Sequence, residues 1–158
     1  MKIAIYPGSF DPITYGHLDI LKNASKIFDK VIIAVAYNSA KRSFLTIEER
    51  LKLINESIRD IPNVSADSFE GLTVEYAKRQ GAKVLIRGLR AVSDFEFEMQ
   101  LSQTNSALYD EIKTVFLTTK PEYNFISSST IKEILQNGGD ISKFVPKPVY
   151  DYLTQNKQ

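Results

Sequence analysis

The sequence of 158 residues predicts an α/β fold: a single doubly wound, Rossmann-like domain with a five-stranded parallel sheet and helices on both faces. Three observations support this prediction. Short apolar runs alternate with segments of helical periodicity, the runs are continuous, and no repeat or linker-like stretch interrupts them. Continuous apolar runs indicate strands covered on both faces, and right-handed crossovers between such strands produce an open sheet of this type. We therefore expect residues 1–158 to form one domain.

Five runs are predicted as strands. Residues 2–6 form the first, and residues 31–37 form the second, which is the longest apolar run. Residues 64–69 are a weaker candidate because polar side chains interrupt them. Residues 84–86 and 112–117 complete the set. β-Branched and aliphatic residues dominate each run, as is typical of strands in the interior of a parallel sheet.

Helical periodicity separates the predicted strands. Apolar positions within residues 20–28 and within residues 47–58 fall on one helical face in each case. The segment 94–108 carries two apolar faces, so one of them is expected to contact a neighbouring subunit, or else the helix is deeply buried. A stripe at residues 131–135 precedes a last helix at about residues 147–156, which is expected to pack on the core or on a neighbouring subunit.

Local signals mark where several helices begin and end. Thr46 with Glu49, and Ser93 with Glu96, have the spacing of a capping box, which satisfies free amides at a helix start. The dipeptide at residues 138–139 supplies two glycines after the helical stripe, which favours a helix end there.

Composition excludes several classes of protein. The chain has 20 Lys and Arg against 19 Asp and Glu, so its net charge of +1 argues against nucleic-acid and membrane-surface partners. It has no Cys, which excludes disulfides and thiolate chemistry and suits a cytoplasmic location. One His without Cys leaves no zinc site of the usual kind. No apolar run reaches the roughly 20 residues of a membrane helix, and the phosphate-loop and dinucleotide fingerprints are missing.

The residues that follow the first predicted strand are the most unusual in the chain. Residues 7–17 contain two Pro and two Gly and end on the single His of the sequence, His17. Free amides at a helix start disfavour a protonated imidazole, so a neutral His17 that donates a hydrogen bond to a phosphate is expected. A surface His in a capping turn is the alternative.

The other strand ends add cations and hydroxyl groups. Lys41 follows the second strand, Thr73 follows the third, Arg87 and Arg90 follow the fourth, and hydroxyl residues at 127–130 follow the fifth. Each has a simpler explanation: a solvated loop, a turn, ion pairs with downstream carboxylates, or N-capping. Ligands of doubly wound folds bind at the carboxyl ends of the strands. A rim of cations and donors there, without a general base, favours phosphate transfer by positioning and charge stabilisation.

Two sets of motifs resemble a known family. The signature of the nucleotidyltransferase superfamily is similar to Gly8-Ser9-Phe10-Asp11-Pro12 followed by Thr14-Tyr15-Gly16-His17. The bacterial phosphopantetheine adenylyltransferases are similar over nearly the whole chain, above all at residues 86–90, 94–99 and 125–129. The resemblance implies reversible transfer of the adenylyl group of ATP to 4'-phosphopantetheine, giving dephospho-coenzyme A and pyrophosphate. That reaction is the penultimate step of coenzyme A biosynthesis. Mg²⁺ held mainly through the ATP phosphates, and assembly into a homohexamer, are also implied.

The resemblance further implies a role for individual residues. His17 would stabilise charge on the α-phosphate of ATP, with Lys41 and Arg90 as the other catalytic residues. The implied binding residues for 4'-phosphopantetheine are Ser9, Lys41, Thr73 and Arg87. The implied ATP-binding residues are Ser9, Phe10, His17, Gly88, Leu89, Arg90, Glu98, Tyr123, Asn124, Phe125, Ile126, Ser127, Ser128 and Ser129. No protein ligand to a metal is implied.

Other functions remain open at this point. A related nucleotidyltransferase could use nicotinamide mononucleotide or glycerol 3-phosphate as acceptor. A protein with the same fold could also sense a nucleotide or coenzyme A without catalysis. A class I tRNA synthetase fragment shares a related His motif, but this chain is short and lacks a basic RNA-binding surface.

Overall fold

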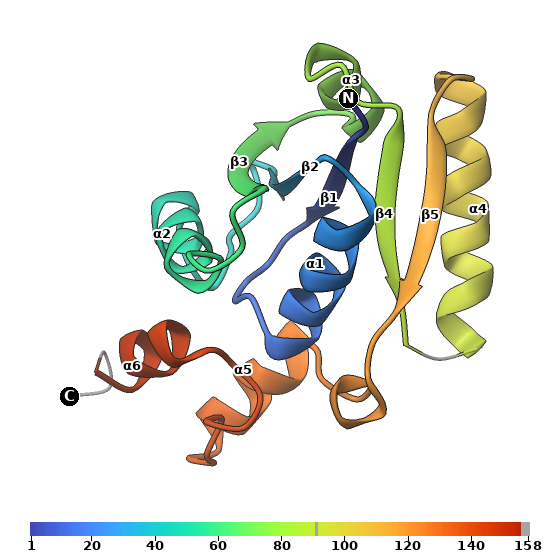
Figure 1. Cartoon of the computed structure of the whole chain (residues 1–158). Helices are drawn as coiled ribbons and strands as arrows, with labels where there is room; N and C mark the ends of the chain where they lie inside the picture. The colour runs from blue at the N-terminus through green and yellow to red at the C-terminus, as the bar shows by residue number, and fades with distance from the viewer. Residues whose placement is uncertain (91, 156–158) are drawn as a thin grey trace.

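The computed structural model describes residues 1–90 and 92–155, without the side chains of residues 92–94. Five parallel strands form one sheet in the order β3-β2-β1-β4-β5 (Figure 1). The predicted five-stranded, doubly wound sheet is therefore confirmed. The strands are β1 (Ile3–Gly8), β2 (Lys30–Tyr37), β3 (Val64–Glu70), β4 (Val84–Leu89) and β5 (Lys113–Thr118).

Six α-helices and one 3-10 helix connect and follow the strands within the described residues. They are α1 (Tyr15–Ile27), α2 (Ile47–Ser57), α3 (Thr73–Arg79), α4 (Val92–Leu108), η1 (Pro121–Tyr123), α5 (Ser128–Gln136) and α6 (Lys147–Gln155). The capping box at the start of α2 is formed as predicted. The predicted cap at Ser93 and the last predicted helical residue, at position 156, lie outside the described side chains and residues. No helix in residues 1–90 and 92–155 has the length and apolar character needed to cross a membrane.

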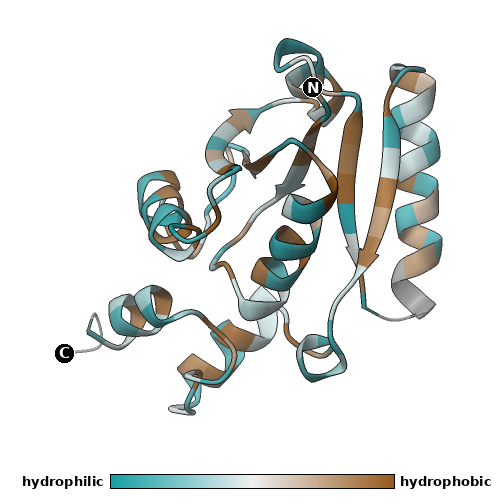
Figure 2. Cartoon of the chain, viewed as in Figure 1, coloured by the Kyte–Doolittle hydropathy of each residue, from teal (hydrophilic) through white to brown (hydrophobic). Residues whose placement is uncertain are grey.

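Alternate residues of the central strands face two separate cores. In β2, Val31, Ile33 and Val35 pack with residues of α1, α2, α5 and α6, whereas Ile32 and Ala34 pack with residues of α3 on the opposite face. Figure 2 shows the hydrophobic colour concentrated along the strands and on the sides of the helices that face them. Helices therefore cover both faces of the sheet.

Helices α6 and α4 differ in how they pack on the sheet. In α6, Val149 and Leu153 are buried in the core that α1 and α2 also line, so this helix packs on the core of its own chain. By contrast, α4 runs along β4 and β5 at the edge of the sheet (Figure 1). Its Phe97 is 63% exposed and its Leu108 is 51% exposed.

β3 and β5 end one residue later than predicted, and β1 and β4 extend further beyond their predicted ends. β1 continues through Pro7 and Gly8, and β4 continues through residues 87–89, which the sequence had suggested for a loop. These extensions arise because β1 keeps pairing with β2 as far as Gly8, and β4 keeps pairing with β5 as far as Leu89. β1 and β4, however, pair only at two positions, 4 with 84 and 5 with 85. The two central strands thus separate before either one ends.

Candidate active site

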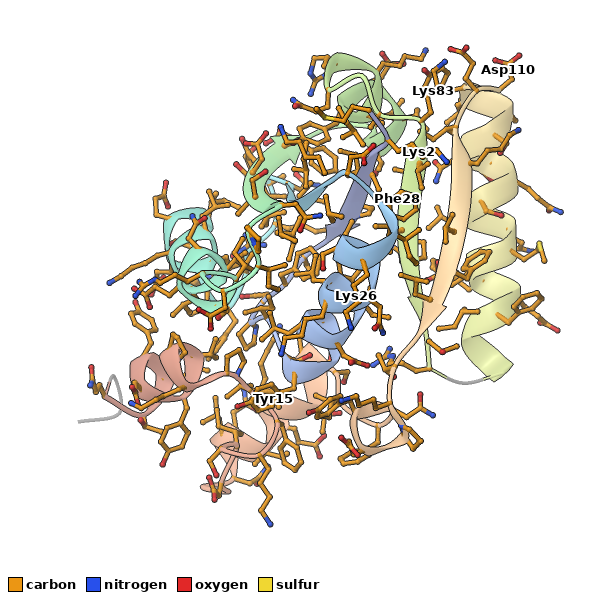
Figure 3. All side chains as sticks on the ribbon, in the orientation of Figure 1. Lys2, Tyr15, Lys26, Phe28, Lys83 and Asp110 are labelled. Atoms are coloured by element: carbon orange, nitrogen blue, oxygen red, sulfur yellow. The ribbon has the colours of Figure 1, made fainter. Side chains whose placement is uncertain are left out.

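A cavity of about 400 Å³ lies where β1 and β4 separate. It is at the end of the sheet where Figure 3 labels Tyr15, at the start of α1, and opposite the end where Lys2 and Lys83 precede their strands. The residues proposed from the sequence that line it are Ser9, Phe10, His17, Arg87, Gly88, Arg90, Glu98, Ile126, Ser127, Ser128 and Ser129.

Two residues suggested for the acceptor substrate are not part of this described lining. Lys41 is exposed in the segment between β2 and α2, where its backbone N–H donates to the Asn38 carbonyl at 2.9 Å. Thr73 is the first residue of α3 and is partly buried there. The structure therefore brings Ser9 and Arg87 together in the cavity, and Lys41 and Thr73 lie outside it.

Several residues suggested for ATP also lie outside the described lining. Leu89 pairs with Thr118 within the sheet. Tyr123 stacks on Tyr15 with 5.9 Å between the ring centroids. Asn124 accepts a hydrogen bond from the Thr119 hydroxyl, and Phe125 is 63% exposed. Tyr123, Asn124 and Phe125 belong to the segment between β5 and α5.

The turn after β1 has a constrained backbone. Phe10 has φ of 45°, a left-handed conformation that is uncommon for a residue with a side chain. Its ring lies over Gly8, where a Cβ atom would be 2.9 Å from Phe10 Cζ. Only glycine fits at position 8 without a shift of that ring, and the ring is needed because it lines the cavity.

His17 is packed against aromatic rings on one side of the cavity. The Phe10 ring meets the imidazole edge-on with 4.9 Å between centroids, and the Tyr6 ring lies at 6.4 Å. Tyr6 and Phe10 also contact each other edge-on at 5.2 Å. These contacts fix the plane of the imidazole and remove much of it from water.

Hydrogen bonds at the start of α1 determine the tautomer of His17. The Thr14 side chain accepts from the His17 backbone N–H, and His17 Nδ1 accepts from the Thr14 backbone N–H at 3.0 Å. This is a capping box in which His occupies the position usually taken by Glu or Gln. Because Nδ1 accepts, the neutral ring carries its proton on Nε2.

Burial and charge keep the ring neutral. Burial, and secondarily the positive charge of Arg90, lower the pKa of His17 from 6.5 to about 4. Burial also raises the pKa of Tyr6, so its hydroxyl stays protonated. The cavity thus contains two neutral groups that can donate a hydrogen bond to an anion.

Arg87 is held by a carboxylate, as the simpler explanation of the sequence had allowed. Its Nε and Nη2 donate to the two carboxylate oxygens of Glu98, both at 2.8 Å, and its Nη1 donates to the Pro7 carbonyl at 3.3 Å. A guanidinium has five N–H donors, so donors are left for a ligand. Glu98, buried and bound on both oxygens, is not placed to act as a general base.

Three further hydrogen bonds lie on the side of the cavity next to α5. Arg90 Nη1 donates to the Ile126 carbonyl at 2.9 Å, which joins the end of β4 to the segment before α5. Ser127 caps α5 by accepting from the Thr130 N–H, and Ser128 donates to the Pro12 carbonyl at 2.8 Å. N-capping, the alternative use of these hydroxyls, therefore accounts for Ser127.

Some residues of the cavity were not among the predicted site residues. They are Tyr6, Pro7, Gly8, Thr14, Gly16, Ile20, Phe97 and Thr119. Thr14 and Gly16 lie within the signature motif, so the motif itself could have identified them. Tyr6 looked like one more residue of a buried strand, and Phe97 looked like part of an apolar helix face.

The cavity has few of the ligands that a resident divalent metal needs. Among residues 1–90 and 92–155, no group of three or more His, Asp or Glu side chains could hold a metal ion. Mg²⁺ prefers carboxylates and phosphate oxygens, and the carboxylate of the cavity, Glu98, is bound to Arg87. These residues do not fit a permanent magnesium site.

Comparison with known proteins gives consistent matches. The chain matches the cytidylyltransferase-like family over residues 5–134. It is 57% identical to the phosphopantetheine adenylyltransferase of Lachnoclostridium phytofermentans, over 97% of this chain and 94% of that one. It is 52% identical to the protein of the same name from Caldanaerobacter subterraneus, over 98% and 97% of the two chains. A solved structure of a candidate nicotinate-nucleotide adenylyltransferase from Vibrio parahaemolyticus superposes with a TM-score of 0.72 at 21% identity, covering 98% and 99%, which shows a shared fold.

The lowered pKa of His17 predicts a measurable titration. Since the chain has one His, its imidazole signals in an NMR titration are unambiguous, and we expect a midpoint near pH 4 with the proton of the neutral ring on Nε2. The unfolded chain, with pKa near 6.5, binds this proton first as the pH falls. The free energy of unfolding should therefore decrease between pH 6.5 and pH 4. A midpoint near 6.5, or a proton on Nδ1 of the neutral ring, would contradict this geometry.

Proposed function

The chain belongs to the cytidylyltransferase-like family and, within it, to the phosphopantetheine adenylyltransferases; from this membership and the cavity we propose that it transfers the adenylyl group of ATP to 4'-phosphopantetheine. The products are dephospho-coenzyme A and pyrophosphate, and the reaction is reversible. In the cell it would be the penultimate step of coenzyme A biosynthesis.

The observation that carries this proposal is the chemistry of the cavity between β1 and β4. The cavity holds a neutral His17, two guanidinium groups and the buried hydroxyl of Tyr6. Its carboxylate, Glu98, is occupied by Arg87. Such a set of donors suits a reaction whose substrates are already anionic and whose transition state gathers negative charge on phosphorus.

The proposed step is a single in-line displacement. A phosphate oxygen of 4'-phosphopantetheine attacks the α-phosphorus of ATP, and the bond from that phosphorus to the bridging oxygen of the β-phosphate breaks. The electron pair leaves with pyrophosphate. Because the attacking phosphate is an anion, no protein base has to remove a proton, and the neutral His17 donates its Nε2–H to an α-phosphate oxygen throughout.

We assign the other residues roles from their positions in the cavity or, for Lys41 and Thr73, from the family resemblance. Arg90, at the end of β4, attracts the outer phosphates of ATP, and Arg87 uses its remaining N–H groups for the phosphate of 4'-phosphopantetheine. Ser9, Phe10 and Gly88 line the nucleotide side with residues 126–129. Lys41 and Thr73 lie outside the described lining of the cavity. By the resemblance, Lys41 would extend from the segment after β2 to the acceptor phosphate, and Thr73 would contact the pantetheine arm. Mg²⁺ would enter with ATP, bound to its phosphates, because the described part of the chain offers no ligand set of its own.

Two other functions make different demands on the same cavity. A nucleotidyltransferase with another acceptor, such as nicotinamide mononucleotide or glycerol 3-phosphate, would need the same hydrogen-bond donors in the cavity. It would not prefer 4'-phosphopantetheine as acceptor. A non-catalytic sensor would bind nucleotide or coenzyme A without releasing pyrophosphate. The cytoplasmic location expected from the absence of Cys stays a prediction.

The proposal predicts pyrophosphate release that needs both ATP and 4'-phosphopantetheine and that stops when EDTA removes Mg²⁺. Replacing His17 by Ala removes one preorganised donor, which commonly costs about 10²–10³ in kcat. The measurement is a coupled pyrophosphate assay with ATP or CTP and each of the three acceptors. Higher turnover with another acceptor, or binding without turnover, would contradict the proposal.

A matched variant separates the donor of His17 from its capping role. His17→Gln keeps an oxygen that can accept from the Thr14 N–H, as Gln does in ordinary capping boxes. We therefore expect its thermal midpoint to stay closer to wild type than that of His17→Ala, while its kcat still falls. Near-normal turnover in a folded His17→Ala protein would exclude the proposed role of His17.

We also propose that the chain forms a homohexamer through α4. Phe97 and Leu108 are exposed on this edge helix, and α4 covers β4 and β5 with its other side. Large exposed apolar side chains on one helix are a common feature of subunit contacts. Light scattering should give six times the chain mass of 17.9 kDa, and Leu108→Glu should lower that mass. A wild-type mass near 18 kDa would contradict assembly.

A further inference from the structure

Two charged side chains outside the described lining of the cavity are almost completely buried beside it. Asp11 is 5% exposed in the turn after β1, and Arg50 is 4% exposed on α2. Burying a charge is costly unless its hydrogen bonds are satisfied. The partners of these two side chains therefore indicate what their burial achieves.

Asp11 holds the chain just before α2. Its Oδ2 accepts from the Phe44 N–H and its Oδ1 accepts from the Leu45 N–H, both at 2.8 Å. Lys132 of α5 lies 3.4 Å from Oδ2 and supplies a counter-charge. One carboxylate thus ties the turn that carries Ser9 and Phe10 to a segment more than thirty residues away.

Arg50 makes a second connection between the same two segments. Its Nη1 donates to the Ser9 carbonyl at 3.0 Å, and its Nη2 donates to the Ser43 hydroxyl at 3.4 Å. Asp11 and Arg50 therefore both join the turn at residues 9–11 to residues 43–45. We call these two side chains and their hydrogen bonds the buried clamp.

The buried clamp lies next to the segment that carries Lys41. Residues 38–42 are exposed and include a local turn in which the Lys41 and Ala40 N–H groups donate to Asn38. Residues 43–45 are the root of this segment, and the clamp fixes the root to the turn whose Ser9 and Phe10 line the cavity. Any approach of Lys41 to the cavity starts from that fixed root.

We propose that Asp11 and Arg50 are positioning residues for Lys41: they set its segment against the turn after β1, so that its ammonium group can reach the acceptor phosphate in the cavity. This inference rests on the proposed function and adds to it two residues that act through Lys41 without touching either substrate. Its observable consequence is that loss of the buried clamp has little further effect on kcat/KM in a protein that lacks the Lys41 side chain.

The test is a double-mutant cycle between Asp11→Asn and Lys41→Ala, read as kcat/KM for 4'-phosphopantetheine at saturating ATP. Removing an acceptor from a charged, buried hydrogen-bond set should lower kcat/KM about 10- to 100-fold in the wild-type background. In the Lys41→Ala background the same substitution should change it less than about threefold, because contacting or dependent residues are not additive. Equal losses in both backgrounds would overturn the proposal.

Controls separate positioning from folding. Hydrogen exchange of the Phe44 and Leu45 amides should accelerate in Asp11→Asn. Asp29→Asn, which changes a carboxylate bound to the Lys2 N–H at the opposite end of the sheet, should leave both the exchange at 44–45 and kcat/KM unchanged. Unchanged exchange at 44–45 in Asp11→Asn would also overturn the proposal.

A second variant covers the case in which Asp11→Asn does not fold. Arg50→Lys keeps the charge but cannot span the Ser9 carbonyl and the Ser43 hydroxyl with one planar group. It should show the same dependence on Lys41, and additive losses would again count against positioning. If wild-type protein releases no pyrophosphate with ATP and 4'-phosphopantetheine, the proposed function fails first, and the role of the clamp in placing Lys41 fails with it.

Discussion

After Ile5 and Leu85, β1 and β4 stop pairing with each other, although each continues to pair with its other neighbour. The chain order reverses at this point of the sheet, so the segments that follow the two strands run in different directions. The space between them cannot be closed by backbone hydrogen bonds. It is lined instead by side chains from β1, β4 and their following segments, with Arg87 reaching across to the Pro7 carbonyl. The position and the chemistry of the cavity both depend on this separation.

The start of α1 gives that space the hydrogen-bond donors that the proposed anion site needs. A helix start offers free amides, and here its cap is made by the imidazole that also lines the cavity. The Thr14 N–H occupies Nδ1, while burial and Arg90 keep the ring uncharged. His17 is thus prepared as a donor and unsuited to be a base at neutral pH. With Glu98 occupied by Arg87, the cavity is equipped to orient phosphates and to receive developing negative charge.

The sequence was informative where interactions are local, and less so where they depend on distant partners. Apolar runs, the capping box at Thr46 and the helix stop at residues 138–139 predicted the class of sheet and most helices, because each depends on a few neighbouring residues. The ends of β1 and β4 were missed because Gly8 and residues 87–89 are held by adjacent strands. Sequence could equally not decide whether Arg87 would be free or bound to Glu98, since both outcomes use the same residues at the same spacing. The contacts of Asp11 and Arg50 could not be predicted, because the Phe44 and Leu45 amides bound by Asp11 and the Ser9 carbonyl bound by Arg50 lie more than thirty residues away.

The proposed mechanism requires that these groups position phosphates for one direct displacement, without a covalent bond to the protein. The stereochemical course of the reaction tests this claim. ATP carrying sulfur on its α-phosphorus in one configuration is converted with 4'-phosphopantetheine, and the configuration at that phosphorus in the product is determined by ³¹P NMR. A single in-line displacement inverts the configuration, which is the predicted result. Retention would show two displacements through a nucleotidylated side chain, such as Ser9, and would contradict the proposed single displacement.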